Sequence, residues 1–112
     1  GLYTVTATLA KTGQSASAPV RVMDLTVPAD IRIGLIESYD TTIRTTLRQM
    51  GVDFDLLADS DLSLDNLRGY TTVIADMRAY FARPAVAAGN GALLDYAKGG
   101  GHLLVLYHKT FE

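Results

Sequence analysis

The stretch IRIGLIESYDTTIRTTLRQMGVDFDLL, residues 31–57, decides the fold. It opens on a short, mostly apolar run, which is typical of a strand buried on both faces of a sheet. Ile43, Leu47 and Met50 then recur at i, i+4 and i+7, so that they line one face of a helix. A second apolar run closes the stretch. Because a connection through a helix joins parallel strands, the stretch predicts a β-α-β unit.

The helix of this unit carries signals for both of its ends. Asp40 precedes it, and the Asp40 carboxylate can accept hydrogen bonds from the unpaired amides of the first turn. Gly51 follows it and, lacking a Cβ, suits the left-handed conformation that ends many helices. We therefore expect a helix between these two residues.

The alternation of strands and helices continues along the chain. The polar segment 59–70 predicts a loop with one short helical turn. Pro84 can open a further helix, but Gly89 and Gly91 weaken it, which favours two pieces with Asn90 capping the second. The residues expected on one face of this helix are Val86, Leu93, Leu94 and Ala97.

The fold class follows from the order of these elements. The expected strands are 31–37, 52–58, 71–77 and 102–107. Strands that alternate with helices over short connections predict an α/β protein with a parallel sheet, here a flavodoxin-like, three-layer α/β/α unit. The chain stops just after the fourth strand, so we expect this unit to be incomplete at its C-terminus. The expected core includes Ile33, Leu35, Leu47, Val73, Ile74, Leu94, Leu104 and Leu106.

The first 27 residues follow a different pattern. YTVTATL, residues 3–9, alternates apolar side chains with Thr, and a second alternating run follows a turn at Gly13, which predicts a β-hairpin. Pro28 marks a boundary, because proline cannot donate into a strand ladder. We therefore expect two units, 1–27 and 28–112.

A lone hairpin is barely stable in water, so it must pack on something. One alternative is that residues 1–27 are the end of a preceding immunoglobulin-like β-sandwich, or a linker, since GLYTVTATL and the strand after it look like closing strands of such a sandwich. The other is an extra hairpin on the main sheet.

Composition restricts the function classes. The 112 residues are 48% hydrophobic with a formal net charge of −2, which fits a globular domain. Lys and Arg are scattered, so nucleic acid is not an expected partner, and no apolar run reaches the length of about 18 residues that suggests a membrane span. The absence of Cys removes disulfides, thiolate metal ligands and thiol nucleophiles. An exposed edge on the fourth strand would permit self-association.

Ligands of open parallel sheets bind beyond the carboxyl ends of the strands. At that edge, MRAYFARP after the third strand faces YHK after the fourth. Guanidinium, phenol, imidazole and ammonium groups could converge there on an anionic or sugar-like ligand. The alternative is that Arg78 pairs with Asp76 or Glu37 and the tyrosines fill the loop. The candidate ligand-binding residues are Arg78, Tyr80, Arg83, His108 and Lys109.

Two further ligand arrangements are weaker. ESYDTT is rich in hydroxyls at a helix start, where phosphate can bind, but it contains no Gly, and Asp40 repels anions. DSDLSLD places acids at alternate positions like a calcium loop, yet Leu64 and Tyr70 occupy the places of the required Gly and Glu. Helix capping and a solvated acidic loop explain both segments better.

The catalytic arrangements are weaker still. His102 and His108 bracket one strand, about 20 Å apart at 3.3 Å per residue, and cannot ligate the same metal ion. Ser38 could meet His108, with Asp40 or Asp76 as the orienting acid, but these residues have no distinctive spacing. We therefore expect neither a metal site nor a catalytic residue in this chain.

The chain also resembles a known family. RIGLIESYDTTIRTTLRQMGVDFDLL, DLSLDNLRGYTTVIADMRAYFARPAV and LLDYAKGGGHLLVLYHKTFE resemble the class I glutamine amidotransferase-like domain in the C-terminal region of bacterial LmbE/PIG-L (GlcNAc-PI de-N-acetylase) proteins. The resemblance covers about residues 28–112, and SYDTT, DMRAYFARP and GGGHLLVLYHKT are its most specific pieces. It implies a flavodoxin-like domain after a β-rich region, in a polypeptide whose zinc-dependent hydrolase domain acts on N-acetylglucosaminyl groups.

The resemblance does not bring catalytic residues with it. Amidotransferases of this fold use a Cys nucleophile, and this chain has none; the deacetylase motif His-x-Asp-Asp is also absent. Zinc is therefore expected only in a catalytic domain outside this chain. The expected function is a non-catalytic accessory domain that packs on other domains of its polypeptide. The alternative is a domain that binds a small molecule, a carbohydrate or an anion, through Arg78, Tyr80, His108 and Lys109.

Overall fold

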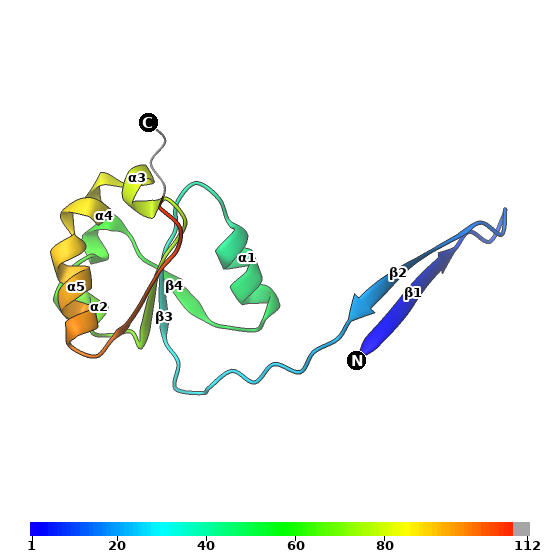
Figure 1. Ribbon diagram of the computed structural model, residues 1–112, viewed down its shortest axis with the longest axis horizontal. Coiled ribbons are helices and arrows are strands. Elements are labelled where there is room, and N and C mark those ends of the chain that lie inside the picture. The colour runs from blue at the N-terminus through cyan, green and yellow to red at the C-terminus, as the bar shows by residue number, and fades with distance from the viewer. Residues whose placement is uncertain (109–112) are drawn as a thin grey trace.

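The computed structural model describes residues 1–108, which form two separate sheets. An antiparallel hairpin is followed by an α/β unit whose four strands are parallel, in the order β4-β3-β5-β6 (Figure 1). The class predicted for residues 28–112, α/β with a parallel sheet, is thus confirmed. The strands are β1 (Leu2–Thr8), β2 (Ser15–Arg21), β3 (Ile33–Ile36), β4 (Phe54–Leu56), β5 (Thr72–Ala75) and β6 (His102–Val105).

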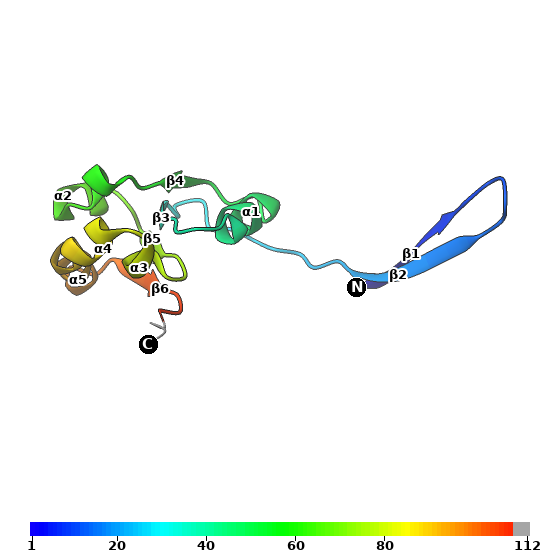
Figure 2. The ribbon, with the colours of Figure 1, turned by 90° about the horizontal axis from the view of Figure 1, so that it is seen from above.

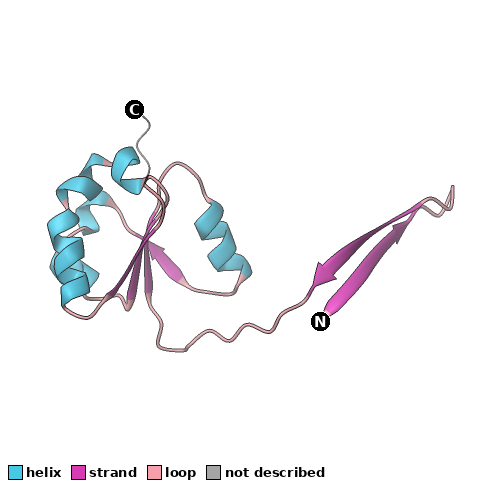
Figure 3. Cartoon of the chain, in the orientation of Figure 1, coloured by secondary structure: helices cyan, strands magenta, loops and turns pink. Residues whose placement is uncertain are grey.

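Helices cover both faces of the parallel sheet. One face carries α1, and the other carries α2, α4 and α5, while α3 lies at the carboxyl ends of the strands (Figures 2 and 3). The polar segment 59–70 holds a 3-10 turn and a short helix, close to the single turn expected there. The helices are α1 (Thr42–Gln49), η1 (Asp59–Asp61), α2 (Leu64–Leu67), α3 (Ala79–Ala82), α4 (Pro84–Ala88) and α5 (Asn90–Lys98).

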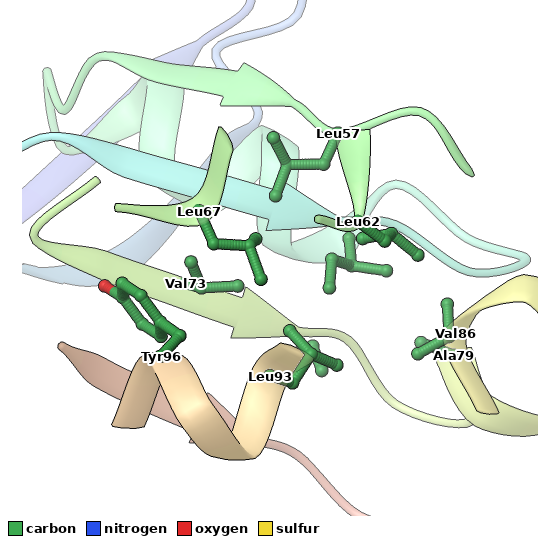
Figure 4. Close-up of a cluster of buried hydrophobic side chains, with 10 residues drawn as sticks. Leu57, Leu62, Leu67, Val73, Ala79, Val86, Leu93 and Tyr96 are labelled. Atoms are coloured by element: carbon green, nitrogen blue, oxygen red, sulfur yellow. The ribbon is translucent and has the colours of Figure 1, made fainter. Parts of the chain in front are cut away.

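Strand β3 divides the core into two clusters. Side chains alternate along a strand, so Leu35 points to the α1 face and Ile36 to the other, and both are fully buried. On the α1 side Leu35 packs with Ile33, Leu47, Val52 and Ile74. The larger cluster, on the α5 side (Figure 4), contains Ile36, Leu57, Leu62, Leu67, Val73, Ala75, Ala79, Val86, Leu93 and Tyr96.

The ends of α1 lie where the sequence predicts them. The Asp40 carboxylate accepts a hydrogen bond from the Thr42 amide at 2.9 Å, which satisfies one unpaired donor of the first turn. Gly51 adopts a φ of 69°, and the Val52 amide then bonds to the Leu47 carbonyl at 2.9 Å. This left-handed residue ends the helix and turns the chain into β4.

The predicted face of the second helix is wrong in part. The helix breaks at Gly89, which also caps α5 in place of the expected Asn90. Beyond the break Leu93 and Tyr96 form the buried face of α5, and Leu94, placed in the expected core, is 48% exposed. Ala97 is exposed as well.

The edge strand β6 supplies a second correction. Leu104, also expected in the core, is 49% exposed. It pairs with Ile74 and therefore faces the α1 side. The cluster under α1 is centred on β3, and no other helix of residues 1–108 covers that face (Figure 2). Leu106, which follows the end of the strand, packs against this cluster as expected, whereas Leu104 does not belong to it within the described residues.

The hairpin projects away from the α/β unit (Figure 1). Every residue of β1 and β2 is exposed, and Gly13 turns the chain between them with a φ of 70°. The radius of gyration, 19.3 Å, exceeds the value of about 13 Å for a compact domain of about 100 residues. The predicted hairpin is confirmed, and it is not an extra hairpin on the main sheet. Its packing on a β-sandwich stays a prediction.

Candidate functional site

Backbone hydrogen bonds bring three strand ends together at the carboxyl edge of the sheet. The Asp76 amide bonds to the Ile36 carbonyl at 3.0 Å, which joins the ends of β5 and β3. The Arg78 amide bonds to the Tyr107 carbonyl at 3.1 Å, which joins the segments after β5 and β6. The polar residues that follow these strands are therefore neighbours, as the parallel topology predicts.

Asp76 is the most buried charged residue of this edge, with 2% of its surface exposed. One carboxylate oxygen accepts a hydrogen bond from the Met77 amide at 2.6 Å, and the other accepts one from the Ser38 hydroxyl at 3.3 Å. The imidazole of a catalytic triad stands between the hydroxyl and the acid. Here Ser38 contacts the acid directly, so this pair does not form a triad.

Tyr80 and His108 form an aromatic pair. Their ring centroids are 4.9 Å apart with an interplanar angle of 84°, an edge-to-face contact. The Tyr80 hydroxyl donates to Oδ1 of Asn90 at 2.8 Å, and burial raises the Tyr80 pKa above its ordinary value. Both ring nitrogens of His108 are buried and have no hydrogen-bond partner among residues 1–108. A buried polar atom without a partner is costly, so this imidazole is the feature of the edge that best suits a ligand.

Arg78 turns the chain from β5 into α3. Its φ of 62° places it in the left-handed region, which is uncommon for a residue with a Cβ. Strained backbone of this kind clusters at functional sites. Lys109, the last residue of the predicted site, lies outside the described residues.

Arg83 is directed into the fold. Its Nε donates to a carboxylate oxygen of Asp59 at 2.8 Å, and Nη2 contacts the same oxygen. Nη2 also donates to the Leu57 carbonyl at 3.0 Å, and Nη1 to the Glu37 carbonyl at 3.2 Å. One guanidinium thus ties the segments after β3 and β4 to the start of α4. These contacts engage all three nitrogens of the guanidinium that the sequence assigns to a ligand.

A hollow of about 510 Å³ lies at the opposite, amino-terminal edge of the sheet. The run of three glycines before β6 marks this hollow in the sequence. The Tyr96 ring packs against Gly101 so closely that a Cβ added there would lie 2.2 Å from a ring carbon. The Tyr96 hydroxyl donates to the Tyr70 carbonyl at 3.1 Å, and that of Tyr70 to Asp55 at 3.2 Å. The hydroxyls that line this hollow therefore serve the fold.

The pKa values of these two tyrosines are raised. For Tyr70 the main cause is burial, followed by the negative charge of Asp55 and the hydrogen bond to it. For Tyr96 the cause is burial, partly opposed by a backbone hydrogen bond. Both phenols therefore stay neutral at physiological pH.

Within residues 1–108 no cluster of three or more His, Asp or Glu side chains could hold a metal ion. No helix in the same range has the length and apolar character needed to cross a bilayer. No family model, curated protein or solved structure matches the chain.

Proposed function

We propose that this chain is a non-catalytic accessory domain of the flavodoxin-like, class I glutamine amidotransferase-like type, in a bacterial LmbE/PIG-L-type carbohydrate de-N-acetylase. The parallel order β4-β3-β5-β6 and the helices on both faces are compatible with that fold. The proposed partners are the other domains of the same polypeptide, one of which holds the zinc.

The observation that carries the proposal is the use of the carboxyl edge. Arg83 binds Asp59 and two carbonyls, and Ser38 binds the buried Asp76. The chain also has no Cys to serve as the nucleophile that amidotransferases of this fold require. An edge whose polar groups stabilise the fold supports a scaffolding role better than turnover.

Two measurements test the accessory role. Purified chain, incubated with glutamine or N-acetylglucosamine, is expected to release neither ammonia nor acetate above a buffer control. Turnover that disappears in His108→Ala but persists in His102→Ala would refute it. The gene is expected to encode a His-x-Asp-Asp motif upstream of Gly1, and its absence would remove the link to a deacetylase.

A second candidate is favoured by one observation, the buried imidazole of His108, whose nitrogens bond to no group in the part of the chain that the structure describes. Tyr80 packs against this imidazole, and the Arg78 amide bonds to the carbonyl of Tyr107, the residue before His108. The imidazole could therefore bind a sugar hydroxyl or a phosphate group at this edge. Lys109 would complete the site that the sequence predicts.

Thermal denaturation tests this candidate with glucosamine, N-acetylglucosamine and glucosamine 6-phosphate as probes. Binding is expected to raise the melting temperature, and His108→Ala to abolish the rise. His102→Ala is the matched control, because it removes an exposed imidazole at the other end of the same strand. Equal shifts in both variants, or none in the unsubstituted chain, would exclude a His108 site for these ligands.

A further inference from the structure

The hollow at the amino-terminal edge of the sheet has the size of a ligand site. Its volume of about 510 Å³ lies within the range of about 300–1,000 Å³ that small-molecule pockets occupy. The end of α5, the start of β6 and the connection into β3 form it, at one end of the sheet (Figure 1). All of its lining residues fall between Pro28 and His102, so the hollow belongs to the described α/β unit and involves neither end of the chain.

Apolar groups make up most of the lining of this hollow. Ile31 and Leu64 contribute aliphatic side chains that are partly buried, and residues 99–101 add backbone without side chains. Gly100 has a φ of 99°, and a Cβ added there would meet no atom within 4 Å, so the space beside it is open. A ligand that fills this space therefore needs an apolar body, whose removal from water favours binding.

The uncompensated charge of the hollow is negative. Two of its charged residues have exposed partners outside the lining, since Arg68 pairs with Asp65 at 3.5 Å and Asp95 with Lys98 at 3.4 Å. Asp30 forms no ion pair within residues 1–108. The C-terminus of α5 also ends at the hollow, and a helix C-terminus is equivalent to about half a negative charge.

The α/β unit itself holds Asp30 beside the hollow. The Ile31 amide donates to the Pro28 carbonyl at 3.3 Å, which closes a turn around Asp30. The Arg32 amide donates to the Thr71 hydroxyl at 2.8 Å, which ties the end of this turn to the start of β5. The backbone that carries the carboxylate is thus fixed independently of the hairpin. A carboxylate held in this way can form a charge-assisted hydrogen bond with a cation.

We propose that the hollow binds a small organic cation, an ammonium or guanidinium group carried on an apolar body. The body lies against Ile31, Leu64 and the glycine run, and the charged group pairs with Asp30 near the end of α5. The imidazole of His102, in its neutral form, can accept a further hydrogen bond. An anion is disfavoured, because it would meet the same carboxylate and helix end. The inference does not depend on the proposed function, since the hollow lies at the edge opposite the carboxyl ends of the strands.

Three probes that share one ring test the chemistry of the ligand. Benzylammonium, benzyl alcohol and benzoate are titrated separately into the chain at pH 8, and binding is followed in amide NMR spectra. Benzylammonium is expected to shift the signals of Gly99, Gly100 and Gly101 and to saturate near millimolar concentration. Its dissociation constant should be at least about threefold lower than that of benzyl alcohol and about tenfold lower than that of benzoate. No saturable shift at these glycines, or equal affinity for benzylammonium and benzoate, would overturn the proposal.

A pair of charge-removing variants tests the role of Asp30. Asp30→Asn should raise the dissociation constant of benzylammonium at least about threefold and leave that of benzyl alcohol unchanged. Asp24→Asn is the matched control, because it removes the same charge from an exposed residue of the same connection that does not line the hollow. Both side chains are exposed, so both variants should keep the melting temperature of the unsubstituted chain. Equal weakening in the two variants would show an effect of net charge alone and refute the site.

Discussion

Replacing Arg83 by Met separates a structural role from a ligand-binding one. Met keeps most of the aliphatic volume and removes the whole guanidinium. The two carbonyl bonds, to Leu57 and Glu37 at 3.0 and 3.2 Å, contribute about 1 kcal/mol each. The ion pair with Asp59, whose side chain is 58% exposed, adds at most about 1 kcal/mol. We therefore expect Arg83→Met to lower the free energy of unfolding by about 2–3 kcal/mol.

Urea denaturation followed by circular dichroism measures this loss, which should appear as a lower midpoint with an unchanged m-value. Arg68→Met is the matched control, because the one ion pair of the Arg68 side chain within residues 1–108 is with the exposed Asp65, at 3.5 Å. It should cost less than about 0.5 kcal/mol. Arg83→Lys should recover less than half of the loss, since one ammonium cannot reach all three acceptors. If the Arg83 and Arg68 variants were equally stable, the structural role of Arg83 would be refuted.

Three further predictions concern the α5 side of the sheet. Leu93→Ala should cost about 2–5 kcal/mol, and Leu94→Ala, beside it but 48% exposed, less than about 1 kcal/mol in the same urea assay. Gly101→Ala should lower the melting temperature, because the new Cβ would collide with the Tyr96 ring. Gly91→Ala should not lower it, because a Cβ added at Gly91 meets no atom within 4 Å outside the backbone of its own helix. Tyr96 has a pKa of 10.0 in the unfolded chain and a higher pKa in the folded one. Above pH 10.0 the unfolded chain therefore releases the phenolic proton more readily, and the free energy of unfolding should fall as pH rises. Tyr96→Phe should flatten that fall, and an unchanged pH profile would contradict the assigned burial.

The sequence predicts the α/β unit well where a local pattern coincides with a tertiary need. The run from Ile33 to Ile36 is buried on both faces, as continuous hydrophobicity indicates, and Gly51 ends α1 because only a residue without a Cβ takes its φ of 69° cheaply. The prediction for Leu94 is wrong because Leu93 and Tyr96 form the buried face of α5, and Leu94 lies beside that face with 48% of its surface exposed. Leu104 differs for another reason, since a strand pattern does not show whether a helix covers it.

The candidate site is harder to predict than the fold. Sequence position places Arg83 at the carboxyl edge correctly, but it does not show the direction of a long side chain, and the guanidinium bonds to Asp59 and the backbone. The contact between Tyr80 and His108 joins segments 28 residues apart, and only the parallel topology brings them together. The Tyr96–Gly101 contact had a local signal, the run of three glycines.

The exposed connection between β2 and β3 has a mechanical consequence. Its side chains include Met23, 76% exposed, and Leu25, 55% exposed, and its contacts with the α/β unit that the structure describes lie in its last part, from Val27 to Arg32. Because so few contacts join the hairpin to the α/β unit, the melting transition of the α/β unit should not depend on the hairpin, which is itself barely stable in water. Mild trypsin digestion after Arg21 should then release a protease-resistant piece whose calorimetric transition matches that of the intact chain.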